Sequence, residues 1–246
     1  MGPPIQTVKS IDRLAYSEVI DVRSPGEYAE DHVPEAKNLY VLDDSQRVEV
    51  GTTYKQVNAF EAKKLGASLV SKNISRWIAN RLRGKPRDYR PLVYCWRGGQ
   101  RSMSLATVLA AIGWEVTVIE GGYKRYRQQV RETLEQAFSS QPLVIITGLT
   151  GTRKTDLLHL LEQRGEQVLD LEGLANHRGS LLGSHPGSQQ PTQKYFESLL
   201  ADRASTLDPK RPLWIEAESN KIGNLYCPLP LWSAMRQAPQ VEINAP

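Results

Sequence analysis

The stretch PLVYCWRGGQRS, residues 91–102, decides the fold of the first half of the chain. It begins with the apolar run Pro91 to Tyr94, which is typical of a buried strand, and it ends where the helical pattern Met103 to Ile112 begins. Elsewhere in this half, strand patterns alternate with helical ones. The sequence therefore predicts an α/β domain with a mainly parallel sheet, with Cys95 just after one of its strands.

The loop after this strand has the composition of an anion-binding thiol site. A cysteine close to a helix N-terminus feels the helix dipole and unpaired N–H groups, both of which favour the thiolate. The glycine pair lets successive N–H groups turn inward around an oxyanion. We predict Cys95, Arg97 and Arg101 as catalytic residues and Gly98 and Gly99 as phosphate-binding residues. The alternative is that Cys95 is a small buried hydrophobic residue with no chemistry.

The composition is that of a globular protein with two domains. The chain has 246 residues, of which 40% are hydrophobic and 24% charged, and no apolar run approaches the length of a membrane span. The first residues lack the basic and apolar segments of a secretory signal, so a cytoplasmic location is expected. The two cysteines, Cys95 and Cys227, fall in different predicted domains, so a disulfide framework is not expected, and a zinc site would lack ligands. The sequence indicates no particular oligomeric state.

Positive charge is concentrated around the cysteine loop. Residues 72–131 contain thirteen Lys or Arg side chains against three acidic ones, although the whole chain carries a net charge of only +4. A polyanion is the expected partner, with nucleic acid ahead of a membrane surface. The alternative is a solvated basic face without a ligand. The basic residues chosen as candidates for this contact are Arg76, Arg81, Arg83, Lys124, Arg125 and Arg127.

Pattern and composition also divide the chain into segments. A strand is expected at residues 18–22, followed by a helix with Ser24 as its cap and Pro25 in its first position. Another strand is expected within residues 114–120. Residues 42–85 form an insertion, in which residues 59–83 are expected to give two helical stretches. A basic helix over residues 123–138 closes the first domain, residues 1–138, and the second domain covers residues 139–246.

The second domain opens with a phosphate-binding pattern. The β-branched strand Leu143 to Thr147 is followed by GLTGTRKT, residues 148–155, and by a helical run. In such a P-loop the backbone N–H groups and a lysine hold phosphates, and a hydroxyl reaches Mg²⁺. The predicted phosphate-binding residues here are Gly148, Gly151, Lys154 and Thr155. Arg153 stands where the pattern has glycine, at a cost of about 1–2 kcal/mol if its backbone is left-handed. The candidate acids near Mg²⁺ are Asp170, Glu216 and Glu218.

Several of these motifs resemble known families. DVR at 21–23, EY at 27–28, HVPEA at 32–36, the cysteine loop and EGG at 120–122 resemble a rhodanese domain in its usual order. The five residues between Cys95 and Arg101 resemble the roomier loop of rhodanese-fold phosphatases. A rhodanese domain followed by a P-loop, together with LDLEGLANHRGS at 169–180, resembles the tRNA 2-selenouridine synthases over nearly the whole chain.

The resemblance implies a substrate and a set of roles. Members of that family replace the sulfur of wobble 2-thiouridine in tRNA with selenium from selenophosphate, and they also transfer a geranyl group from geranyl diphosphate to that sulfur. Cys95 would carry selenium or assist its delivery, with Arg97 and Arg101 holding selenophosphate. Lys154 and Thr155 would hold diphosphate. The resemblance leaves open whether Mg²⁺ and a nucleotide also bind at this site.

Further partners and alternatives follow from the same resemblance. The basic residues, with His177 and Arg178, would contact tRNA, and an enzyme that supplies selenophosphate is a further expected partner. Family members continue past the end of this sequence, so the second domain is expected to be C-terminally short and incomplete. Two other functions stay open: a rhodanese-type sulfurtransferase or phosphatase with a nucleotide-binding domain, and a truncated, non-catalytic tRNA-binding paralogue.

Overall fold

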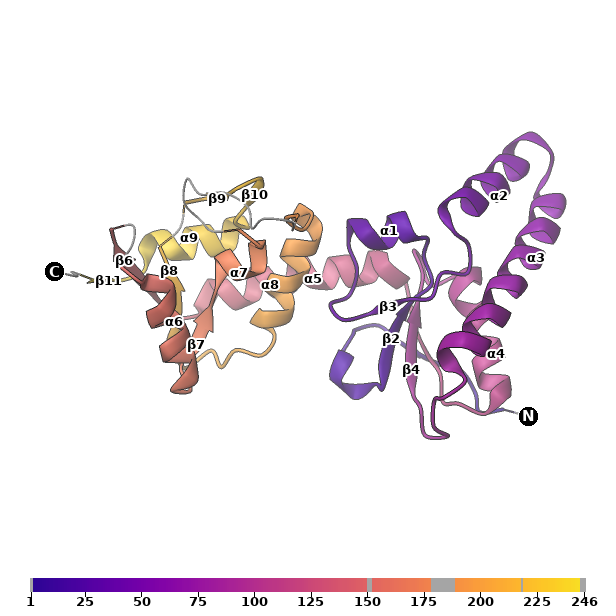
Figure 1. Ribbon diagram of the computed structural model, residues 1–246, viewed down its shortest axis with the longest axis horizontal. Coiled ribbons are helices and arrows are strands. Elements are labelled where there is room, and N and C mark those ends of the chain that lie inside the picture. Colours follow the sequence, from indigo (N-terminus) through magenta and orange to yellow (C-terminus); the bar gives the residue numbers. More distant parts are fainter. Residues whose placement is uncertain (1, 150–151, 178–188, 218, 244–246) are drawn as a thin grey trace. The chain divides into compact units, whose positions relative to one another are not determined.

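The computed structural model describes residues 2–149, 152–177, 189–217 and 219–243. The chain divides into two compact units, Met1–Gln129 and Val130–Pro246. The division falls inside helix α5 (Gly122–Ser140), whereas the sequence placed the boundary near the end of this helix. Figure 1 shows the elements of each unit.

The first unit is built on a five-stranded sheet whose neighbouring strands all run parallel. The strands, in spatial order, are β1 (Gln6–Val8), β5 (Thr117–Ile119), β4 (Pro91–Tyr94), β2 (Glu18–Asp21) and β3 (Lys37–Asn38). Strand β4 is central and all four of its residues are buried, as expected for a strand covered on both faces. The predicted α/β class with a parallel sheet is therefore confirmed.

The other elements of this unit are helices and helical turns. They are η1 (Arg13–Ala15), α1 (Pro25–Glu30), α2 (Asp44–Gln56), α3 (Ala59–Trp77), η2 (Ile78–Leu82), α4 (Gln100–Ile112) and α5. Helix α1 begins as predicted, because the Ser24 and Glu27 side chains form a reciprocal capping box and Pro25 stands at the first helical position. Helix α4 follows the cysteine loop and buries Leu105 and Leu109 completely. These two side chains anchor the helix in the core of the first unit.

The insertion differs from its prediction. Instead of two helices within residues 59–83 there is one long helix, α3, which continues into the π-helical turn η2. A further helix, α2, precedes them, and α2 and α3 lie side by side as a helical hairpin (Figure 1). The sequence missed most of α2 because polar and charged residues dominate it and it buries none of them, so it has no apolar stripe. Ile74 of α3 and Leu82 of η2 are buried in the core.

The second unit has a four-stranded parallel sheet. Its strands, in spatial order, are β11 (Gln240–Ile243), β6 (Leu143–Gly148), β8 (Leu213–Glu216) and β7 (Gln167–Leu169). Its helices are α6 (Lys154–Gln163), α7 (Leu171–Ala175), α8 (Gln193–Ala204) and α9 (Leu229–Gln237), and a short antiparallel pair joins β9 (Lys221–Ile222) to β10 (Leu225–Tyr226). Strand β6 therefore runs directly into the loop that precedes α6, as a P-loop requires.

Both units have their own apolar core. Ile20, Val93 and Leu105 are fully buried in the first, and Ile146 and Leu158 are fully buried in the second. Among the described residues, no helix has the length and apolar content needed to span a membrane.

Candidate functional site

Cys95 lies where the sequence predicts it, immediately after β4 and before α4. Its side chain is 3% exposed, and the cysteine is free, as is Cys227. The Gly99 N–H donates to the Cys95 Sγ over 3.3 Å, and the Ser102 Oγ lies 3.3 Å from the same sulfur. Ser102 also donates to the Gly99 carbonyl over 3.0 Å, so its proton has two alternative acceptors. The sulfur is thus surrounded by donors from the loop and the first turn of α4.

These donors give the thiol an acidic character. Burial raises the pKa of Cys95, but hydrogen bonds from the Ser102 side chain and from the N–H groups of Ser102, Gly99 and Arg97 lower it. The net result is a pKa below the ordinary value of a cysteine. The thiolate is therefore stabilised mainly by hydrogen bonds from the Ser102 hydroxyl and the loop N–H groups. The alternative of a chemically inert cysteine is not favoured by these contacts.

Replacing Ser102 by alanine is expected to make Cys95 less acidic. The substitution removes the side-chain hydrogen bond that lowers the pKa most, so a smaller fraction of the thiol is ionised at neutral pH. The rate of alkylation by iodoacetamide, measured against pH, should have its midpoint at higher pH and the same plateau in alkaline solution. Ser104→Ala is the matched control, because its hydroxyl bonds to the Gln100 carbonyl. An unchanged midpoint in Ser102→Ala would contradict the assigned role.

The backbone of the loop fits tightly against the start of α5. The Tyr123 N–H donates to the Cys95 carbonyl over 2.7 Å, and the Lys124 N–H donates to the Trp96 carbonyl over 3.2 Å. Gly98 and Gly122 have φ values of +68° and +57°. A Cβ on Gly122 would collide with the Cys95 carbonyl oxygen, so only glycine fits there. The N-terminus of α5 therefore fixes the main chain on which Cys95 sits.

Arg101 is held by a carboxylate that the sequence had not singled out. Its Nη1 and Nη2 lie 2.7 Å and 3.3 Å from the two carboxylate oxygens of Glu27 on α1. Glu27 is 13% exposed and its second basic neighbour is Arg47, at 3.9 Å. Burial raises the pKa of Glu27, but the hydrogen bond and charge of Arg101 outweigh it, and the net pKa is lowered. Arg97, in contrast, is exposed.

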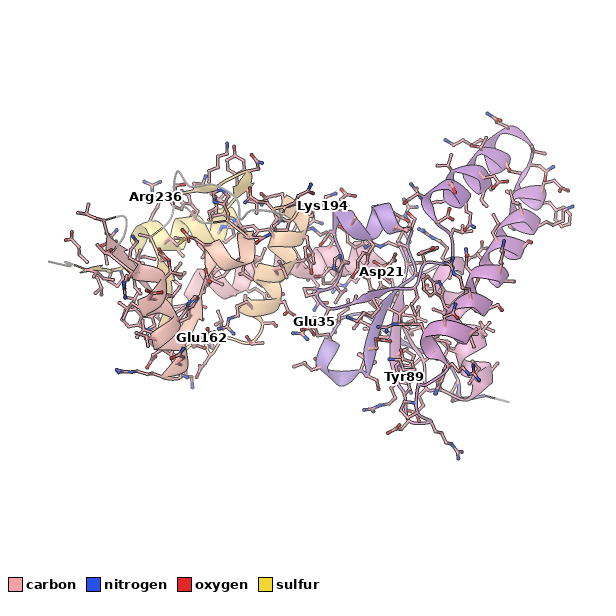
Figure 2. All side chains as sticks on the ribbon, viewed as in Figure 1. Asp21, Glu35, Tyr89, Glu162, Lys194 and Arg236 are labelled. Carbon is pink, nitrogen blue, oxygen red and sulfur yellow. The ribbon has the colours of Figure 1, made fainter. Side chains whose placement is uncertain are left out.

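A buried charged network lies beneath the loop. The Arg23 guanidinium is 1% exposed and forms a bidentate pair with Asp21, with its Nη2 2.7 Å from an Asp21 oxygen. It also lies 4.0 Å from the centre of the Tyr123 ring, and the Tyr123 hydroxyl donates to Asp31 over 2.8 Å. Asp21 lies at the end of β2, within the first unit (Figure 2). This network braces the residue, Tyr123, that holds the Cys95 carbonyl.

The loop of the second unit has the lysine of a P-loop. Arg153 has φ +58° and ψ +37°, so the residue that replaces glycine does adopt the left-handed backbone, and α6 begins at Lys154. The Lys154 Nζ donates to the carbonyls of Gly148 and Leu149 over 3.0 Å and 3.2 Å, which places it over the loop. Gly148 has φ +150°. Gly151 lies outside the described residues.

Thr155 and Glu216 form the part of this site that fits a cation. The Thr155 hydroxyl donates to a Glu216 carboxylate oxygen over 2.9 Å. Burial raises the pKa of Glu216, Thr155 and Lys154 lower it, and the charges of Glu172 and Asp170 raise it further, so the net pKa is above the ordinary value. A hydroxyl and a carboxylate surrounded by further negative charge are suitable ligands for Mg²⁺ beside a phosphate.

The other candidate acids have different positions. Asp170 caps α7, because its side chain accepts the Gly173 N–H over 2.7 Å, and it lies 3.4 Å from the His159 Nε2. It contributes charge to the Glu216 site while serving as a helix cap. Glu218 lies outside the described residues.

The predicted RNA-contacting residues fall into two groups. The exposed ones are Arg76, which lies over the rings of Tyr40 and Trp77, with Arg81, Arg83 and Lys124. The others are engaged with the protein: Arg125 donates to the Lys9 carbonyl, Arg127 lies 3.7 Å from Asp31, and His177 is 9% exposed. Arg178 lies outside the described residues. The first group therefore offers more to a polyanion than the second.

The two units together define a class of protein: a rhodanese-like domain with a cysteine in the loop after its central strand, joined to a P-loop-type domain. The family model of the rhodanese-like domain matches residues 6–129, and that of the tRNA 2-selenouridine synthase AAA domain matches residues 141–246. The chain belongs to the tRNA 2-selenouridine synthase family.

Full-length relatives agree with this assignment. The tRNA 2-selenouridine synthase of Psychromonas ingrahamii is 37% identical over 95% of this chain and 62% of its own length. That of Shewanella loihica is 39% identical over 93% of this chain and 61% of its own length. The chain thus spans about three fifths of the length of these relatives.

A solved N-terminal domain from Clostridium difficile 630 is 35% identical over 52% of this chain and 98% of that one, with a TM-score of 0.44.

Proposed function

We propose that this chain acts as a tRNA 2-selenouridine synthase, replacing the sulfur of wobble 2-thiouridine with selenium from selenophosphate. The observation that carries the proposal is the acidic Cys95 thiol, held by Ser102 and loop N–H groups. The name shared by its relatives supplies the substrate.

The cysteine loop provides a nucleophile for the phosphorus of selenophosphate. Attack by the Cys95 thiolate forms an S–P bond and breaks the P–Se bond, and selenium leaves with the electron pair as hydrogen selenide. The loop N–H groups and Arg97 hold the phosphoryl oxygens, and Arg101 joins them once it is released from Glu27. Water then cleaves the S–P bond and restores the thiol. Hydrogen selenide is the species that enters the nucleobase.

The P-loop unit holds the diphosphate of geranyl diphosphate. The thiouridine sulfur attacks the geranyl C1, an S–C bond forms and diphosphate leaves. Hydrogen selenide then adds at C2, the C2–S bond breaks, and the sulfur leaves with its geranyl group as geranylthiol. Lys154 neutralises the diphosphate, and Thr155 and Glu216 would hold Mg²⁺ there, which would supply further positive charge. A nucleotide is the alternative occupant of the same loop.

The exposed basic residues of the first unit contact the tRNA backbone. Arg76, Arg81, Arg83 and Lys124 are exposed and carry positive charge. Binding should therefore weaken as salt concentration rises. An enzyme that makes selenophosphate is the expected upstream partner, because the co-substrate is a labile phosphorus–selenium compound.

The proposal is tested by incubating thiolated tRNA with selenophosphate, geranyl diphosphate and the protein, and digesting the RNA for mass spectrometry. Selenouridine is expected with the wild-type chain and is expected to be absent with Cys95→Ser. Cys227→Ser is the matched control, since Cys227 is a buried free cysteine of the other unit. Selenouridine in equal amounts from Cys95→Ser would remove the proposed role of the thiol, and none from any variant would favour a sulfurtransferase, a phosphatase or a non-catalytic paralogue.

A further inference from the structure

A large groove lies between the α2–α3 hairpin and α4, next to the cysteine loop. Its volume is about 890 Å³. Tyr54 of α2 and Met103 of α4 lie on its two sides, and Gln100 and Arg101, the first residues of α4, also line it. The groove therefore connects the helical insertion with the residue, Arg101, that stands beside the reactive loop. Its volume lies within the range of about 300–1,000 Å³ found for small-molecule pockets.

The charge of the groove has one sign. Three basic side chains line it, those of Arg47, Lys63 and Arg101, and no acidic side chain of the described residues does. Apolar contact comes from Val50, Val70 and Met103, and polar side chains from Gln100, Ser104 and Thr107. A ligand that matches this lining carries negative charge, a flat or apolar face, and edges that form hydrogen bonds.

The hairpin adjoining the groove exposes unusually large apolar side chains. Tyr54, Val57 and Phe60 are 61%, 63% and 68% exposed and follow one another where α2 ends and α3 begins. The Lys64 ammonium lies 5.3 Å from the centre of the Phe60 ring. Exposed apolar side chains gathered in one place mark an interaction surface rather than a folding core. Rings interleaved with lysines are the pattern that stacks unpaired bases and neutralises their phosphates.

We propose that this groove binds unpaired nucleotides of the RNA substrate, with Tyr54 as a stacking platform and Arg47 and Lys63 as phosphate contacts. The inference rests on the proposed function, and it names the part of the RNA and the surface that receives it. Double-stranded RNA presents its bases stacked and paired, so only unpaired nucleotides can place a base against Tyr54. The groove then leads the reactive base toward Arg101 and the Cys95 loop.

An RNA rather than a geranyl chain is favoured as the occupant by the polar side of the groove. Gln100 and Thr107 are exposed in the groove. A bound aliphatic chain would cover these two side chains without giving them a hydrogen-bond partner, whereas the edge of a nucleobase would form hydrogen bonds with them.

The test measures binding of the 246-residue chain to two fluorescently labelled RNAs by anisotropy. One is a hairpin with an unpaired loop that contains 2-thiouridine, and the other is a fully paired duplex of the same length. The wild-type chain is expected to prefer the hairpin. Tyr54→Ala is expected to weaken hairpin binding about tenfold and to leave duplex binding unchanged. Lys63→Ala should weaken binding and lower the slope of log K against log salt by about 0.7–0.9.

Tyr226→Ala is the matched control, because Tyr226 is 51% exposed on β10 of the other unit, and its RNA binding should equal that of the wild type. Since Tyr54 is exposed, circular dichroism should show an unchanged fold in Tyr54→Ala. Equal hairpin binding by Tyr54→Ala and wild type would overturn the inference. So would weaker binding of geranyl diphosphate by Tyr54→Ala with unchanged RNA binding. Because these readouts need no catalysis, a chain that binds RNA through Tyr54 but makes no selenouridine would refute only the proposed function.

Discussion

Replacing Arg23 by methionine is expected to lower the free energy of unfolding by about 3–5 kcal/mol, the usual cost of breaking a buried ion pair by removing one partner. The Asp21 carboxylate is fully buried, and its bidentate contact with Arg23 would be lost, which leaves it with the main-chain N–H of residue 23 at 2.8 Å and the Tyr94 hydroxyl. Methionine fills most of the space but supplies no donor. Urea unfolding followed by circular dichroism measures the loss.

The substitution should also affect the cysteine loop. Arg23 lies over the Tyr123 ring, and the Tyr123 N–H holds the Cys95 carbonyl, so Arg23→Met is expected to slow alkylation of Cys95 as well. Arg13→Met provides the control, because the Arg13 pair with Glu35 is at the surface, with Glu35 74% exposed, and such pairs contribute about 0–1 kcal/mol. Similar unfolding free energies for the two variants would show that the buried pair is not a main support of the fold.

Replacing Gly122 by alanine should have the largest effect on the cysteine loop. The new Cβ would meet the Cys95 carbonyl oxygen and the main-chain nitrogens of Gly98 and Arg97, which are backbone atoms that cannot turn aside. The positive φ of +57° adds about 1–2 kcal/mol for any residue other than glycine. The loop N–H groups would then move away from the sulfur. We expect alkylation of Cys95 at neutral pH to fall about tenfold or more, as its hydrogen bonds to the thiolate are lost.

Gly84→Ala is the matched control, because it makes the same substitution at a glycine whose surroundings leave room for a side chain. A Cβ at Gly84 would have no atom within 4 Å, so both stability and alkylation should match those of the wild type. Normal thiol reactivity in Gly122→Ala would mean that the start of α5 does not position the loop.

The sequence was most informative where pattern and chemistry coincide. The strand–cysteine–glycine–helix order of residues 91–112 predicted β4, the loop and α4, because a buried parallel strand and a following helix leave few alternatives. The Ser24–Pro25 helix start was predicted because local rules of capping govern it. The P-loop pattern likewise marked Arg153 as the residue that would carry a strained backbone if the loop needed a left-handed conformation there, and the structure has that conformation. These are short-range effects, which adjacent residues determine.

Features that depend on contacts between distant segments were not predicted. The pairing of Arg101 with Glu27 joins residues 74 positions apart, and no spacing rule connects them. Ser102 was quoted as part of the loop but received no role, although a hydroxyl in the first turn of the helix after the cysteine was a usable signal. Helix α2 was missed because it packs mainly on α3, so its stability comes from a neighbour that its own sequence does not reveal.

The Glu27 carboxylate is an intramolecular competitor of any anion that approaches Arg101. Inorganic phosphate and selenophosphate present the same phosphoryl oxygens to the loop amides, so each must exchange with Glu27 before the guanidinium can bind it. The pairing therefore lowers the affinity of the loop for both anions and does not by itself distinguish between them.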